Sequence, residues 1–198
     1  MSDQPSNYDA VKTAHASLAI LAWTVFFPLG GIVIRVLSSP RAWLVHGLLQ
    51  LFSYAMFTTA VGMGIWMTQN SHNVYLSLYF HVGVDGSADI DQEIGSYHPV
   101  IGLVVFALVS FEPIGGYVHH YFYKREDRRA VIAWTHVWLG RILITLGMIN
   151  GGLGLLLSSD AERGEYIAYG VIAALIWISY MAFVALWHVR RPEPLVEK

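Results

Sequence analysis

Five apolar runs, each long enough to cross a lipid bilayer, restrict the fold of this chain more than any other feature. A helix needs about 20 mainly apolar residues to cross a hydrocarbon core about 30 Å thick. The runs occupy residues 14–36, 43–67, 98–122, 132–157 and 166–188. The sequence therefore predicts an all-α integral membrane helical bundle with five transmembrane helices, in a single domain covering residues 1–198.

The composition agrees with a membrane protein and narrows its chemistry. Hydrophobic residues make up 55% of the chain, so we expect contact with lipid. The net charge of -2 gives no excess of positive charge to bind nucleic acid, so we expect no nucleic-acid partner. Cysteine is absent, which excludes disulfides, thiolate metal sites and covalent haem attachment. Any metal has to be held by nitrogen or oxygen atoms or by methionine, and nine histidines are present.

The positions of lysine and arginine predict the orientation, because cytoplasmic loops carry an excess of both. Only Lys12 and Arg163 fall on one side. The other side holds a larger set: Arg35, Arg41, Lys124, Arg125, Arg128, Arg129, Arg190, Arg191 and Lys198. We therefore expect a multi-pass protein of the plasma membrane or an endomembrane, with a cytosolic C-terminus. The N-terminus, which lacks the pattern of a signal peptide, and the acidic loop 68–97 are expected outside the cytosol.

Four histidines lie near the starts of the first four spans: His15, His46, His98 and His136. Successive spans run in opposite directions. His15 and His98 are therefore expected near the outer surface, and His46 and His136 near the inner one. The sequence predicts two histidine pairs, one in each leaflet.

A four-helix bundle places its first and third helices on one diagonal and its second and fourth on the other, so each pair can clamp a flat macrocycle. Two axial imidazoles suit a haem that carries electrons. We therefore predict a four-helix dihaem core with two non-covalent haems b. A histidine at a membrane interface is often only a wetted edge residue. A zinc site would need clustered ligands, whereas these pairs are expected roughly 20 to 25 Å apart along helices that rise 1.5 Å per residue.

Other polar residues near these histidines are secondary candidates. Gln50 follows His46 by one helical turn and is a candidate for hydrogen bonding within the site. His120, at an inner helix end, is the best substitute for an inner ligand. The remaining histidines are expected to be surface or snorkelling residues: His72, His81, His119 and His188.

Arg141 lies inside the fourth span, where an unpartnered charge is costly. Glu112 in the third span reaches a similar depth. We expect Arg141 to pair with Glu112 or to hold a haem propionate near the inner site. The alternative is a packing ion pair with no redox role.

Four segments together resemble the cytochrome b561 domain, especially the fungal form fused to a DOMON domain, which is also a ferric reductase-like transmembrane domain: HASLAILAWTVFFPLGGIVIR, WLVHGLLQLFSYA, HPVIGLVVFALVSFEPIGGYVHHYFYK and WTHVWLGRILITLGMINGGLGL. The resemblance covers residues 13–190. It implies two haems b, held by His15 with His98 and by His46 with His136, that pass electrons across a membrane. The family's donors include ascorbate, and its acceptors include ferric chelates and partner redox proteins. Animal and plant members commonly have six spans, whereas five are expected here.

Basic residues at the expected inner mouth are candidates for contact with an anionic reductant. These candidates are Arg35, Arg41, Lys124 and Arg125. The alternative is that they only enforce topology. The sequence is compatible with a homodimer.

We therefore predict a transmembrane oxidoreductase that carries electrons from a cytosolic reductant to a non-cytosolic acceptor. Two other functions stay open. One is a haem-free transporter or channel, in which the intramembrane polar residues line a path. The other is a haem-bearing membrane anchor subunit of a larger dehydrogenase.

Overall fold

The computed structural model describes residues 5–70, 97–123, 129–158 and 161–190. Their regular elements are α1 (Tyr8–Leu21), a π-helical segment η1 (Ala22–Phe26), α2 (Phe27–Val36), α3 (Ala42–Asn70), α6 (His98–Tyr123), α7 (Arg129–Ser158) and α8 (Arg163–Arg190). Because α1, η1 and α2 are continuous, the described residues contain five helices long and apolar enough to cross a membrane. The predicted five-span, all-helical bundle is confirmed. The first span begins at Tyr8, six residues before its predicted start.

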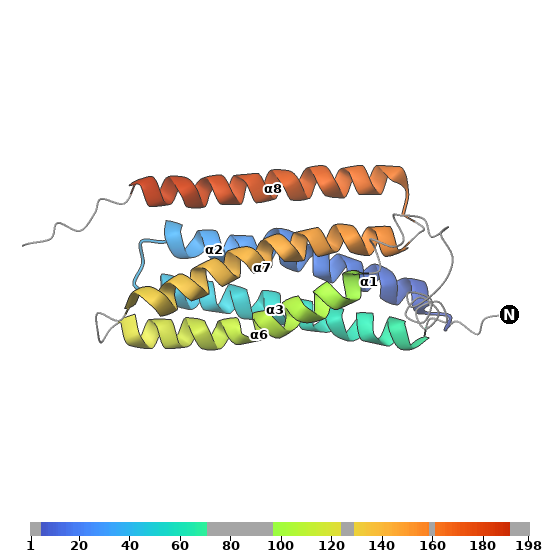
Figure 1. Ribbon diagram of the computed structural model, residues 1–198, viewed down its shortest axis with the longest axis horizontal. Helices are drawn as coiled ribbons and strands as arrows, with labels where there is room; N and C mark the ends of the chain where they lie inside the picture. Colours follow the sequence, from blue (N-terminus) through green and yellow to red (C-terminus); the bar gives the residue numbers. More distant parts are fainter. Residues whose placement is uncertain (1–4, 71–96, 124–128, 159–160, 191–198) are drawn as a thin grey trace, which may run out of the picture.

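Four of the five spans form a ring, and the fifth lies outside it (Figure 1). Packing contacts join α1 to α3, α3 to α6, α6 to α7, and α7 back to α1. The two diagonals of the ring are α1 with α6 and α3 with α7. The outer helix, α8, packs against α2, η1 and α7. This arrangement leaves the four histidine-bearing spans as the core of the bundle.

The first span contains one local irregularity. Proline has no N–H to donate to the carbonyl four residues earlier, so Pro28 cannot complete a regular helix over η1. The chain instead forms π-type bonds, and the N–H of Phe27 donates to the carbonyl of Ala22, five residues back. A π-helical segment accommodates one extra residue within an otherwise α-helical span.

Large apolar side chains cover the surface of the bundle, unlike in a water-soluble protein, and a few polar side chains lie inside it among apolar ones. Ser53, Thr24, Arg141 and Asn150 are all buried. Large side chains on the outer faces are exposed, including Leu48, Phe111, Ile114 and Leu175. A contiguous apolar surface of this kind suits contact with lipid.

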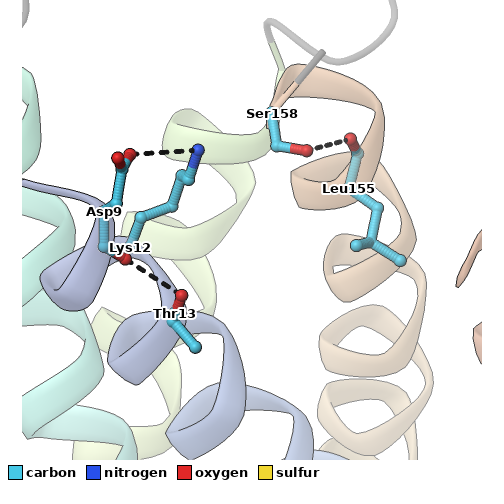
Figure 2. A network of polar contacts seen from close by, with 5 residues as sticks. All are labelled: Asp9, Lys12, Thr13, Leu155 and Ser158. Carbon is cyan, nitrogen blue, oxygen red and sulfur yellow. Dashed lines mark hydrogen bonds and ion pairs between the residues drawn. The ribbon is translucent and has the colours of Figure 1, made fainter. Parts of the chain in front are cut away.

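The two ends of the bundle differ in charge. At one end α1 begins and α7 ends (Figures 1 and 2). There Lys12 Nζ lies 3.7 Å from Asp9 Oδ1, and Thr13 donates a hydrogen bond to the Asp9 carbonyl (Figure 2). We call this the N-terminal end. Among the described residues, the opposite end, where α2, α6 and α8 end and α3 and α7 begin, carries Arg35, Arg41, Arg129 and Arg190, and it is called the basic end.

Candidate metal centres

The structure brings His15 and His98 together near the N-terminal end. They come from α1 and α6, which face each other across one diagonal of the ring. Their ring centres are 5.8 Å apart, and their planes are nearly perpendicular at 87°. The two side chains therefore lie close together, and their joint ligation of a haem stays a prediction.

His46 and His136 form a second pair near the basic end. They come from α3 and α7, the helices of the other diagonal. Their ring centres lie 6.3 Å apart, again at 87°. Both pairs thus have the same relative orientation, although they come from different helices.

The spacing of each pair fits one metal ion between two imidazoles. A coordinated nitrogen lies about 2 Å from its metal, so two rings on opposite sides of one ion have their centres roughly 6 Å apart. Among the described residues, no three or more His, Cys, Asp and Glu side chains are grouped so that they could hold a metal ion. Two protein ligands per centre suit a metal whose remaining positions are filled by a macrocycle, as in haem.

Each of the four imidazoles has an oxygen atom close to its Nδ1 atom, as a hydrogen-bond acceptor in three of them and as an ion-pair contact in the fourth. For three of them the acceptor is a backbone carbonyl: Ala60 for His15 at 2.7 Å, Gly30 for His46 at 2.8 Å, and Asn150 for His98 at 2.9 Å. For His136 the contact is with Oε2 of Glu112, at 2.5 Å. An acceptor at Nδ1 fixes the tautomer and leaves Nε2 available as a ligand, as in most histidine metal sites.

These acceptors recur at a fixed spacing. Three helices carry a candidate ligand and, 14 positions later, the acceptor for a histidine of a neighbouring helix: His46 and Ala60 on α3, His98 and Glu112 on α6, and His136 and Asn150 on α7. Fourteen residues are close to four turns, so ligand and acceptor lie on one face. In the first span His15 and Gly30 are 15 positions apart, and the π-helical η1 between them accommodates the extra residue.

Glycines let three of the histidine rings lie directly against a neighbouring backbone. A Cβ atom on Gly64 would be 3.2 Å from His15, one on Gly154 would be 2.9 Å from His98, and one on Gly116 would be 3.4 Å from His136. Each of these glycines follows the acceptor on its own helix by four residues. Acceptor and glycine therefore form one surface against which the imidazole is held.

The region between the two pairs is apolar and aromatic. Trp23 stacks on Phe27 with ring centres 4.4 Å apart and meets Phe57 edge to face at 4.9 Å. All three side chains are buried. The pairs are separated along the helices by about 14 residues, which corresponds to roughly 21 Å.

Arg141 was predicted to pair with Glu112 or to hold a haem propionate. The structure gives each of these two residues a contact with a further residue. Glu112 lies against His136 as described above. Arg141 is 7% exposed, and its guanidinium carbon lies 4.8 Å from the ring centre of Trp138. An ion pair between Arg141 and Glu112, and a contact between Arg141 and a haem propionate, stay predictions.

Gln50 and His120 have partners of their own. Gln50 donates from Nε2 to the carbonyl of Phe27, at 3.2 Å, so it helps to hold α3 against α2 beside the His46 contact. The His120 ring stacks on Trp43, with centres 4.1 Å apart. Both histidine pairs form without His120.

The predicted substrate residues are only partly described. Arg35, near the end of α2, donates to the carbonyl of Gly31 and acts electrostatically on His46. Arg41 is exposed in the turn before α3. Lys124 and Arg125 lie outside the described residues.

Sequence reasoning missed the contact of Glu112 with His136 and the roles of Gly64, Gly116 and Gly154. A signal for the glycines was present. In three spans a glycine follows the candidate ligand by 18 positions, which is five helical turns. A glycine five turns after each candidate ligand lies on the same helix face as that ligand. The repeat indicates that a side chain of a neighbouring helix packs closely against the backbone at the glycine.

The chain is similar in sequence to a known protein. A cytochrome b561 and DOMON domain-containing protein of Arabidopsis thaliana is 27% identical over 177 residues, which cover 88% of the chain and 38% of the relative. The chain thus spans about two fifths of that relative's length. No protein-family model matches the chain, and no solved structure matches it significantly. The similarity over most of the chain, together with its five spans, supports membership of the cytochrome b561 family.

Proposed function

We propose that this protein carries electrons across a membrane through two haems b, one held by His15 and His98 and the other by His46 and His136. The observation that carries the proposal is the geometry of the two pairs. Each pair has a ring separation that fits a shared metal. Three of the imidazoles donate from Nδ1 to a backbone carbonyl, and the fourth contacts the carboxylate of Glu112. When bound, haem iron supplies one-electron oxidation and reduction.

The chain's own residues supply ligands and exclude water. Two axial imidazoles at each centre leave no open iron position for dioxygen, which favours electron transfer over oxygenation. The buried aromatic side chains of Trp23, Phe27 and Phe57 keep the space between the centres apolar. Arg141, buried at the level of the His46–His136 pair, is proposed to hold a haem propionate.

The basic end is proposed to face the cytosol and to receive the electron donor. Arg35 and Arg41, with Lys124 and Arg125, give this end a positive potential that attracts a small anionic reductant. Ascorbate is a reductant of this class.

The N-terminal end is proposed to deliver electrons outside the cytosol. A ferric chelate or a redox protein would serve as the acceptor. The Arabidopsis relative includes a DOMON domain by its name, so we include a DOMON-type protein among the candidate redox partners.

An optical spectrum of the purified full chain tests this function. We expect a haem Soret band, a sharp b-type α band after reduction with dithionite, and two haems per chain in a pyridine haemochrome assay. The variants His15→Leu and His46→Leu should each bind one haem fewer. A well-folded wild-type chain without Soret absorbance would overturn the proposal and favour a haem-free transporter or channel.

Ascorbate in place of dithionite tests the donor. Rapid reduction of the wild-type chain, slowed in the double variant Arg35→Gln and Arg41→Gln, is the expected result. Reduction by dithionite alone would leave electron transfer in place and exclude ascorbate as the donor.

A further inference from the structure

One of the four candidate ligands, His136, differs from the other three in the charge of the group next to its Nδ1 atom. His15, His46 and His98 each contact a neutral backbone carbonyl. His136 contacts the carboxylate of Glu112, with Oε2 2.5 Å from Nδ1. The side chains of Glu112 and His136 are only 13% and 21% exposed, so little water screens the contact.

The surrounding helices hold Glu112 in this position. It lies on α6 one turn before Gly116, and the missing side chain of Gly116 lets the His136 ring approach the α6 backbone. Across the interface, Oε2 of Glu112 lies next to Gly140 on α7, where a Cβ atom would be 4.0 Å away. Pro113 follows Glu112 directly within α6, and the helix bends along its length (Figure 1).

We propose that Glu112 is a positioning residue that makes His136 the strongest electron donor of the four axial ligands and so lowers the midpoint potential of the haem held by His46 and His136. This inference rests on the proposed function, because it requires that both centres hold haem. It assigns to Glu112 a role on one centre only.

The physical reason is the effect of a carboxylate on a coordinated imidazole. A carboxylate next to Nδ1 raises the basicity of the ring more than a neutral carbonyl does, because its negative charge stabilises positive charge on the ring. A more basic imidazole stabilises ferric iron relative to ferrous iron and lowers the reduction potential. Arg35 and Arg141 are cations on the same side of the bundle, and their positive charge favours ferrous iron and raises the reduction potential. Glu112 therefore offsets their effect and makes electron passage to the other haem more favourable.

An equilibrium redox titration of the full-length, haem-loaded chain tests this role in Glu112→Gln. Glutamine keeps the shape and an acceptor oxygen but removes the charge. We expect one of the two midpoint potentials to rise and the other to stay unchanged, with two haems still bound. The low-spin electron paramagnetic resonance signal of the same haem should shift as its axial ligand becomes a weaker donor.

Two further variants make the result specific. Glu112→Asp keeps the charge and should return the potential most of the way toward the wild-type value. Ser110→Ala removes the 3.0 Å hydrogen bond between Ser110 and Tyr54, two residues away on the same helix, and should move neither potential.

The outcomes separate this inference from the proposed function. A wild-type chain that does not bind two haems overturns the proposed function. Two haems with both potentials unchanged in Glu112→Gln overturn the role of Glu112 alone, as does an equal shift of both. If Glu112→Gln binds only one haem, Glu112→Asp decides. Retention of both haems in Glu112→Asp, with potentials close to the wild-type values, supports the role, and loss of one haem in Glu112→Asp as well overturns it.

Discussion

Gly64 lies on α3 where the edge of the His15 imidazole packs against the helix backbone. Because glycine has no side chain, the ring can lie this close to α3. A Cβ atom at this position would come 3.2 Å from the ring, whereas one on Gly62 would meet nothing within 4 Å. The two glycines are thus a matched pair on one helix.

We expect Gly64→Val to displace His15 and to remove the haem proposed for the His15–His98 pair, while the other haem is retained. Overpacking of this kind typically costs about 1–3 kcal/mol. Haem content per chain and the amplitude of the reduced α band measure the effect. The control, Gly62→Val, should retain both haems, and equal haem loss in the two variants would contradict the expectation.

His120 contacts Trp43 instead of an imidazole, with the two planes only 19° apart. We expect His120→Ala to retain both haems and to lower the free energy of unfolding by about 0.5–1.5 kcal/mol, the range typical of an aromatic pair. Thermal unfolding and the haem spectrum check the two parts of the prediction. Loss of one haem in this variant would instead make His120 a ligand.

At the residue scale, the sequence located the histidines but not the groups that hold them. Alternating helix direction is enough to sort His15, His46, His98 and His136 into two levels. The Nδ1 acceptors depend on the axial register between neighbouring helices, which hydropathy does not specify. For this reason Glu112 was placed at the correct depth, yet its contact with His136 was missed.

The helix α8 shows how an element outside the ring is attached to it. Trp177 Nε1 donates to Thr145 Oγ1 on α7 at 2.9 Å, and Tyr169 donates to the carbonyl of Met148 at 2.5 Å. Both bonds join α8 to α7, and neither involves a candidate ligand.

A double-mutant cycle with Trp177→Phe and Thr145→Val tests this attachment. Hydrogen bonds between membrane helices contribute about 0.6 kcal/mol on average, so we expect a coupling energy of that order between the two substitutions. Unfolding of the chain in detergent gives the free energies, and the spectrum should show both haems in every variant. Strictly additive effects would show that this bond does not stabilise the bundle.

At the scale of elements, the five spans were predicted because a run of about 20 apolar residues has few other folds available. The π-helical η1 was not predicted. Pro28 gave a sign of irregularity, but the form it takes depends on the packing of Trp23 and Phe27 against the other helices. The early start of α1 at Tyr8 was also missed, since polar residues there lower the hydropathy without preventing a helix.

Across the whole molecule, the absence of cysteine makes the orientation directly measurable. Ser38 is exposed at the basic end, and Glu162 is exposed at the N-terminal end. We expect Ser38→Cys to react with a membrane-impermeant maleimide only after the membrane is opened, and Glu162→Cys to react in intact cells. The unsubstituted chain is the control, and the reverse labelling would contradict the proposed orientation.

At this scale the sequence predicted the membrane bundle and the division of its charges between two ends. The ring order of the helices was expected from four antiparallel spans, and the fold agrees. The place of α8 outside the ring agrees with the predicted four-helix core, because the fifth span has no histidine near its start. The helices against which α8 packs, α2, η1 and α7, were not predicted.

The spacing of 14 residues between ligand and acceptor has a mechanical consequence. Every span of the ring carries a candidate ligand near one of its ends and, near the other end, the group that contacts a histidine of a neighbouring span. A shift of any one span along its axis would therefore disturb both histidine pairs together, so the bundle has to be rigid over its whole length for either pair to keep its geometry.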